Sequence, residues 1–185
     1  MKRMLALILS AAAGLAGPAC AEVLDANASG FQLRDSVSVA APPAQVYAAL
    51  GQIQRWWNSQ HTFSGSAANL SLDLKAGACF CETLPGGGSV RHMVVAAAMP
   101  GKLLRLEGAL GPLQSEGAAG SLSWALAAKG QGADLVLTYT VGGYSKRGWP
   151  AWAPDVDQVL QEQLSRLKNY VETGKPESVE QKPSS

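Results

Sequence analysis

Residues 153–174 read APDVDQVLQEQLSRLKNYVETG, and this stretch predicts one long amphipathic helix near the C-terminus. Pro154 and Asp155 suit the start of a helix, and Gly174 suits its end. Apolar residues recur over about 17 residues, or roughly 25 Å of helix. They have the spacing of one buried helical face: Val156, Val159, Leu160, Leu164, Leu167 and Val171. A helix of this kind needs an apolar surface on which to pack.

The chain before this helix is typical of antiparallel strands. A first strand is predicted at 31–39, followed by two short helices at 43–50 and 52–58. About six further stretches alternate apolar and polar residues between turns rich in glycine and proline: 70–75, 78–84, 90–98, 102–108, 120–127 and 134–141. The predicted fold class is therefore α+β: a curved antiparallel sheet of about seven strands around the long C-terminal helix, with a cavity between them.

The stretch VAAPPAQVYAAL at 39–50, followed by Trp56 and Trp57, resembles the opening motif of a known superfamily. This is the START-like helix-grip superfamily, also called SRPBCC, which includes polyketide cyclases and lipid-transfer proteins. The resemblance covers roughly residues 31–172. It implies a helix-grip fold with an internal pocket for a mostly apolar ligand. It does not imply one activity, because the same scaffold carries binding, transport and catalysis.

The first 21 residues predict a signal peptide. A basic start precedes an apolar run at 5–17, and small residues lead up to Ala21, as a signal peptidase requires. The run is shorter than the roughly 20 residues of a transmembrane helix. Cys20 raises the alternative of a lipoprotein anchor, which Gly17 three positions earlier disfavours. Cleavage near Ala21 would give a periplasmic or secreted protein.

The remaining chain predicts one domain with short flanking segments. We expect an N-terminal extension at 22–30, a START-like ligand-binding domain at 31–173 and a polar, disordered tail at 174–185. With 15 Lys and Arg against 14 Asp and Glu, the composition offers no strongly basic surface for nucleic acid. No other stretch has the length and hydropathy of a membrane span. The expected partner is a small apolar ligand or lipid, and the oligomeric state is not predicted.

Cysteine and histidine residues flank a tight turn of proline and glycine. This hairpin predicts four cross-strand pairs: Cys79 with Val94, Phe80 with Met93, Cys81 with His92, and Glu82 with Arg91. In this register Cys79, Cys81 and His92 share one face and line the cavity, while the charged pair of Glu82 and Arg91 faces outward. A shift of this register by one residue would instead pair Glu82 with His92 and separate the cysteines from His92.

Three interpretations of this cluster remain open. Two thiolates and an imidazole suit zinc or copper, although Cys-x-Cys is not the usual zinc spacing. A Cys79–Cys81 disulfide suits an oxidising compartment, although such residues of a strand lie about 6.5–7 Å apart, at the edge of the allowed range. We favour the third interpretation, in which both thiols pack as small hydrophobic groups and His92 lies in the pocket wall. No cofactor is expected.

The tryptophans are candidates for both core and pocket. Trp56 and Trp57 are neighbours, so at most one of them can point fully inward from a helix. The other should lie at the rim. Trp124 lies on the apolar side of a strand and is expected in the core, whereas Trp149 and Trp152 lie at a possible pocket mouth.

The favoured function is binding of a hydrophobic small molecule or lipid in the cavity. The alternative is a cyclase- or dehydratase-type enzyme that uses His92 as acid or base, assisted by Tyr139 or Glu82. A third is a metal or redox site at Cys79, Cys81 and His92. A buried polar pair within hydrogen-bond distance would favour chemistry, and an apolar lining would favour carriage. The expected ligand-binding residues are Trp56, Phe80, His92, Leu106, Trp124, Tyr139, Leu160 and Leu164. Phe80 is included although the predicted register places it on the outer face with Glu82.

Overall fold

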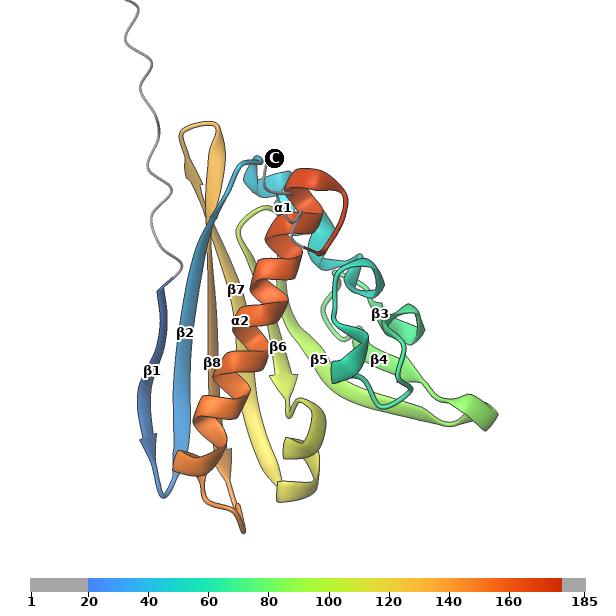
Figure 1. Ribbon diagram of the computed structural model, residues 1–185, viewed down its shortest axis with the longest axis vertical. Helices are drawn as coiled ribbons and strands as arrows, with labels where there is room; N and C mark the ends of the chain where they lie inside the picture. Colours follow the sequence, from blue (N-terminus) through green and yellow to red (C-terminus); the bar gives the residue numbers. More distant parts are fainter. Residues whose placement is uncertain (1–19, 178–185) are drawn as a thin grey trace, which may run out of the picture.

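The computed structural model describes residues 20–177, and it shows one antiparallel sheet with a long helix packed on one face (Figure 1). The strand order is β1-β2-β8-β7-β6-β5-β4-β3. Residues 1–19 and 178–185, which include most of the predicted signal peptide and tail, lie outside the described residues. The eight strands are β1 (Cys20–Asn27), β2 (Gly30–Val39), β3 (Leu70–Leu72), β4 (Cys79–Thr83), β5 (Ser89–Met99), β6 (Leu103–Gly108), β7 (Ala118–Lys129) and β8 (Gly132–Gly143).

The predicted α+β helix-grip fold is confirmed, with eight strands instead of about seven. The additional strand is β1, which begins in the last two residues of the predicted signal peptide, continues into the segment expected as an N-terminal extension, and pairs with β2. The register of this pair shifts between Val23 and Asp25. A shift of this kind interrupts the period of two, so alternation does not mark this strand in the sequence.

The first short helix is confirmed as α1 (Pro43–Leu50), whereas the second is replaced by two 3₁₀ helices. These are η1 (Ile53–Arg55) and η2 (Ser59–His61). Because the chain leaves helical geometry at Trp56, with φ −127° and ψ −20°, Trp56 and Trp57 both turn inward. They are 1% and 6% exposed, so the expectation that one of them lies at the rim is wrong.

The long helix is α2 (Trp149–Thr173), and it begins earlier than its predicted start near Ala153. Pro150 occupies its first turn, where a missing N–H costs no hydrogen bond. Gly174 ends the helix as expected, in the left-handed conformation with φ 78°. The apolar face packs on the sheet through fully buried side chains, among them Ala153, Leu160, Leu164 and Leu167.

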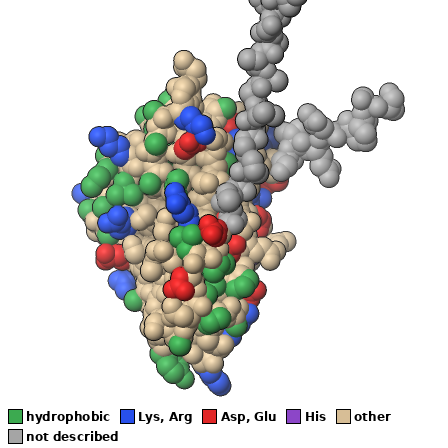
Figure 2. Space-filling model, turned by 90° about the vertical axis from the view of Figure 1, so that its left-hand side faces the viewer, with side chains coloured by type: hydrophobic (Ala, Val, Ile, Leu, Met, Phe, Trp, Pro, Cys, Tyr) green, Lys and Arg blue, Asp and Glu red, His purple; other side chains and the backbone are tan. Residues whose placement is uncertain are grey.

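The surface of the described residues mixes charges of both signs. Figure 2 shows Lys and Arg side chains scattered among Asp and Glu side chains over the face it presents. Among the described helices, none combines the length and hydropathy needed to cross a membrane.

Asp35 interrupts the apolar interface between β2 and α2. Its side chain is 2% exposed, and neither carboxylate oxygen has a hydrogen-bond partner among residues 20–177. Burial, together with the carboxylate of Asp157 on α2, raises the pKa of Asp35 to about 7. The folded chain therefore binds this proton more tightly than the unfolded chain does, and ionisation of Asp35 favours unfolding.

Asp35→Asn should remove this pH dependence. Relative to the variant, the free energy of unfolding of the wild type should fall as pH rises from about 4 to 7, by on the order of a few kcal/mol, because one pKa unit corresponds to about 1.4 kcal/mol. The variant should be more stable than the wild type at pH 8 and similar at pH 4. Its amide can also donate to the unpaired Oδ1 of Asp157.

Urea unfolding at pH 4, 6 and 8 measures this difference. The exposed residue Asp73 provides the control, since Asp73→Asn should leave the pH profile unchanged. Parallel profiles for the wild type and Asp35→Asn would show that Asp35 is ionised without penalty in the folded protein.

Candidate functional site

A cavity of about 330 Å³ opens between four parts of the fold: the segment around η2, the sheet at β3–β5, the 3₁₀ helix η5 (Gly111–Glu116), and the first half of α2. Most of the side chains that line it are apolar or aromatic. The lining residues are Trp57, Gln60, His61, Thr62, Phe63, Leu70, Phe80, His92, Leu110, Gly111, Pro112, Leu113, Trp152, Asp155, Val156, Val159 and Leu160.

A β-bulge decides which side chains of β4 and β5 face this cavity. The predicted pairs of Cys79 with Val94 and Phe80 with Met93 are confirmed. The register then shifts, so that Cys81 pairs with Arg91 and Glu82 with Val90. The predicted pairs of Cys81 with His92 and Glu82 with Arg91 are therefore wrong. His92 is the extra residue on β5, and both His92 and Met93 are buried on the inner face.

The bulge separates the predicted cluster onto two faces of the sheet. Glu82 and His92 lie inside, whereas Cys79 and Cys81 lie on the outer face and are joined by a disulfide with Cα atoms 5.3 Å apart. The favoured interpretation, two buried free thiols, is therefore wrong. A site of two sulfurs and the imidazole is wrong too, because they point to opposite sides. Residues 20–177 contain no group of three or more His, Cys, Asp or Glu side chains able to hold a metal ion.

Gly108 at the end of β6 permits the close approach of the bulged strand. Its φ is 142°, and a Cβ atom there would lie 2.8 Å from the carbonyl oxygen of His92. Any other residue would push β5 away or deform β6. Gly108 thus helps to hold the backbone that turns the His92 side chain inward.

Glu82 and His92 form a buried hydrogen-bonded pair. The distance between Glu82 Oε2 and His92 Nε2 is 3.0 Å, and the residues are 1% and 6% exposed. Glu82 also accepts hydrogen bonds from the backbone N–H groups of Phe63, at 3.1 Å, and Ser64, at 2.5 Å. A chain segment at the cavity mouth and a strand of the sheet therefore both fix the carboxylate that orients His92.

The charge state of the pair follows from these contacts. Burial opposes ionisation of Glu82, but the hydrogen bonds from Ser64, Phe63 and His92 outweigh it and lower its pKa. Burial lowers the pKa of His92, and Glu82 opposes this shift only in part. A neutral imidazole must donate its Nε2–H to the carboxylate, since the carboxylate can only accept. Nδ1 is then the nitrogen that can accept a hydrogen bond or take a proton.

Aromatic rings surround this pair. The ring of Phe80 lies 4.8 Å from that of His92 and 5.6 Å from that of Trp57. Phe63 also stacks on His92, with ring centroids 5.8 Å apart, and at 56% exposure it forms part of the rim. The polar pair is thus enclosed by low-dielectric material, which strengthens its interaction with any polar group of a ligand.

Three of the eight expected ligand-binding residues line the cavity, namely Phe80, His92 and Leu160. The other five are buried outside its lining: Trp56, Leu106, Trp124, Tyr139 and Leu164. The core position expected for Trp124 is confirmed. Tyr139 accepts a hydrogen bond from the backbone N–H of Leu110 at 3.1 Å, so it holds the chain that leads into η5, and it does not line the cavity beside His92. Trp152 lies in the cavity wall, whereas Trp149 is buried.

Sequence reasoning missed Trp57, Phe63 and the whole wall formed by η5. The segment 109–117 has apolar residues but no strand or helix period, so it offered no pattern. Its glycine and proline content indicates only a loop. Trp57 is missed because a regular helix at 52–58 turns only one of the two neighbouring tryptophans inward, and Trp56 is the one expected there.

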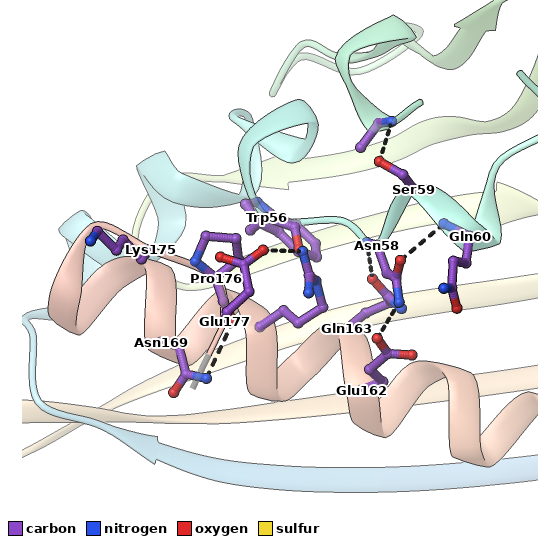
Figure 3. A network of polar contacts seen from close by, with 12 residues as sticks. Trp56, Asn58, Ser59, Gln60, Glu162, Gln163, Asn169, Lys175, Pro176 and Glu177 are labelled. Carbon is purple, nitrogen blue, oxygen red and sulfur yellow. Dashed lines mark hydrogen bonds and ion pairs between the residues drawn. The ribbon is translucent and has the colours of Figure 1, made fainter. Parts of the chain in front are cut away.

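A polar network joins the segment beside the cavity to α2 (Figure 3). The backbone N–H of Asn58 donates to Gln163 at 2.8 Å, and the Asn58 amide donates to Glu162. Arg166 donates to the carbonyl oxygen of Trp56 at 2.8 Å and pairs with Glu177 at 3.3 Å. The network fixes the chain that carries Trp57 against the helix. It also places Glu177, within the segment expected as a disordered tail, against the folded domain.

Comparisons with known proteins agree with this fold. A family model described as polyketide cyclase / dehydrase and lipid transport matches residues 31–172. No curated protein matches the chain in sequence. The fold is similar to CalU16 from Micromonospora echinospora, with TM-score 0.57, 16% identity, and 86% of each chain covered. It is also similar to Aha1 from Colwellia psychrerythraea, with TM-score 0.56, 19% identity, and 78% of this chain and 98% of that chain covered.

The two histidines of the chain allow a direct test of the charge state of His92. Its imidazole signals in an NMR pH titration should show a pKa below the ordinary value, with Nδ1 unprotonated at neutral pH. Glu82→Gln should lower that pKa further, because the carboxylate is what opposes the effect of burial. Glu162→Gln, which alters the contact to His61 at the rim, should leave the His92 titration unchanged. A His92 pKa above the ordinary value in the wild type would contradict the neutral charge state assigned to it, and a protonated Nδ1 at neutral pH would contradict the assigned tautomer.

Proposed function

The chain belongs to the polyketide cyclase / dehydrase and lipid transport family, and we propose that it binds an apolar small molecule or lipid in the cavity between the sheet and α2. The observation that carries this proposal is the lining of the cavity. Aliphatic and aromatic side chains from four elements converge on it, and the buried pair of Glu82 and His92 supplies a polar contact. Pockets of this composition are typical of small-molecule sites.

The energetics of such a site divide between burial and orientation. Apolar contact with Trp57, Phe80, Val156 and Leu160 would stabilise a ligand by about 25 cal/mol per Å² of buried surface. His92 would then orient the ligand, since Nδ1 can accept a hydrogen bond from a hydroxyl or amide group. An apolar body with one polar donor matches this wall.

We also propose that the protein works outside the cytoplasm after cleavage near Ala21. The basic and apolar N-terminal pattern supports this, and so does the Cys79–Cys81 disulfide, because such bonds persist in oxidising compartments. Cleavage after Ala21 would leave residues 22–27 of β1 to pair with β2. N-terminal sequencing of protein from a periplasmic fraction should therefore begin at Glu22.

A second candidate function is acid–base catalysis in the same cavity. The specific observation in its favour is the Glu82–His92 hydrogen bond, because a carboxylate that orients a neutral imidazole makes Nδ1 a competent general base. His92→Gln separates the two functions. A carrier should retain the same bound molecule in the variant and the wild type, whereas an enzyme should accumulate unconverted substrate only in the variant. Mass spectrometry of the extracted molecules distinguishes these results.

Val159→Phe should block binding by placing a ring in the cavity. The neutral fluorophore N-phenyl-1-naphthylamine serves as the probe, and native mass spectrometry detects any molecule that copurifies. We expect at least a tenfold loss of probe affinity and loss of the copurified molecule. Gln158→Phe is the matched control, since it adds the same ring at the exposed neighbouring position on α2. Equal binding by both variants, with the fold retained, would place the ligand elsewhere.

A further inference from the structure

The disulfide between Cys79 and Cys81 encloses a single residue, Phe80. A disulfide stabilises a protein mainly by restricting the unfolded chain, and this restriction grows with the length of the closed loop. A loop this short restricts the unfolded chain little, so the bond contributes little to the stability of the whole domain. Both cysteines are partly exposed on the outer face of β4, where a small reagent can approach the sulfur atoms.

A cation lies beside this bond. Arg91 is exposed on β5, directly opposite Cys81, and Ser71 faces Cys81 from β3 on the other side. Directly opposed residues of antiparallel strands have Cβ atoms about 4.5–5.5 Å apart. From this position the Arg91 side chain is long enough to bring its guanidinium to Cys81, where a cation stabilises a thiolate, and a stabilised thiolate is a better leaving group in thiol–disulfide exchange. Glu82 is the acidic residue nearest in sequence, but it points to the opposite face.

We propose that Cys79–Cys81 is a redox-active disulfide that exchanges with dithiols, with Cys81 as the leaving sulfur. A thiolate of the dithiol attacks Cys79 Sγ, the Cys79–Cys81 bond breaks, and the Cys81 thiolate forms beside Arg91. The second thiol of the reagent then attacks the mixed disulfide and releases the Cys79 thiolate. Two electrons pass to the protein, and the two protons lost by the dithiol are available to the cysteine sulfurs. The dithiol becomes a disulfide.

The redox state of this pair is transmitted to the inner face of the sheet. Cys79 and Cys81 have Cα atoms 5.3 Å apart, whereas two steps along a regular strand advance about 6.4–6.8 Å. The register shift of β4 against β5 falls between Phe80 and Cys81, at the point where His92 is the extra residue. Reduction allows β4 to extend here, which moves Phe80 against His92. An effect on a bound molecule additionally rests on the proposed function of the cavity.

The test uses the folded full chain and dithiothreitol. After reduction, acid quenching and alkylation, the tryptic peptide of residues 76–91 contains both cysteines of the pair and excludes Cys20. We expect reduction under native conditions, without denaturant. Arg91→Gln should slow it several-fold, whereas Arg34→Gln, an exposed arginine on β2, should not. Because trypsin does not cleave after glutamine, the peptide of the Arg91→Gln variant extends to Lys102, and it still excludes Cys20.

NMR of the His92 imidazole provides a readout that does not depend on any ligand. Reduction of the wild type should shift these signals, and the double variant Cys79→Ser with Cys81→Ser should give the shifted signals without reductant. A disulfide that reacts only in denaturant, or that reacts equally fast in Arg91→Gln, would overturn the proposed exchange. Unchanged His92 signals on reduction would overturn the transmission to the inner face. Loss of probe binding by Val159→Phe, the test of the proposed function, is unaffected by either result.

Discussion

The packing of α2 on the sheet is the constraint on which the rest of the structure depends. An antiparallel sheet with one apolar face must cover that face, and α2 is the long helix of the described chain that does so. With 25 residues it spans about 37 Å at 1.5 Å per residue. Leu164 and Leu167 face the sheet, while Val156 and Val159 face the cavity. The helix therefore covers the core and also forms a wall of the cavity.

The interior contains polar groups of two kinds, and they differ in how they are compensated. Glu82, His92 and Gln163 have hydrogen-bond partners that join separate elements. These contacts fix the position of each element, so burial of the polar atoms costs little. Asp35 lacks such partners in the described part of the chain, and its burial is compensated by holding a proton instead. The carboxylate of Glu82 thus orients His92, whereas that of Asp35 makes the packing of α2 on β2 sensitive to pH.

The sequence predicted those features that repeat along the chain. The strands from β2 to β8 follow a period of two residues, and the apolar face of α2 follows a period of 3.6. Gly174 marks the end of α2 because glycine readily adopts the left-handed conformation found there. The features it did not predict break a period. The bulge at His92, the departure from helical geometry at Trp56 and the irregular segment of η5 each depend on tertiary contacts. Because these three features build most of the cavity, the fold was more predictable than the site.

The bulge shows why one residue of register matters so much for this site. With regular pairing, Glu82 would oppose Arg91 and the sulfurs would share a face with His92. The extra residue on β5 instead turns His92 to the same side as Glu82 and leaves Arg91 opposite Cys81. Glu82 and His92 then lie on the inner face of the sheet, and Arg91 and the disulfide lie on the outer face at the same place. Phe80 connects them, since it lies between the two cysteines in sequence and its ring contacts His92. A change at the outer pair therefore has a short covalent path to the wall of the cavity.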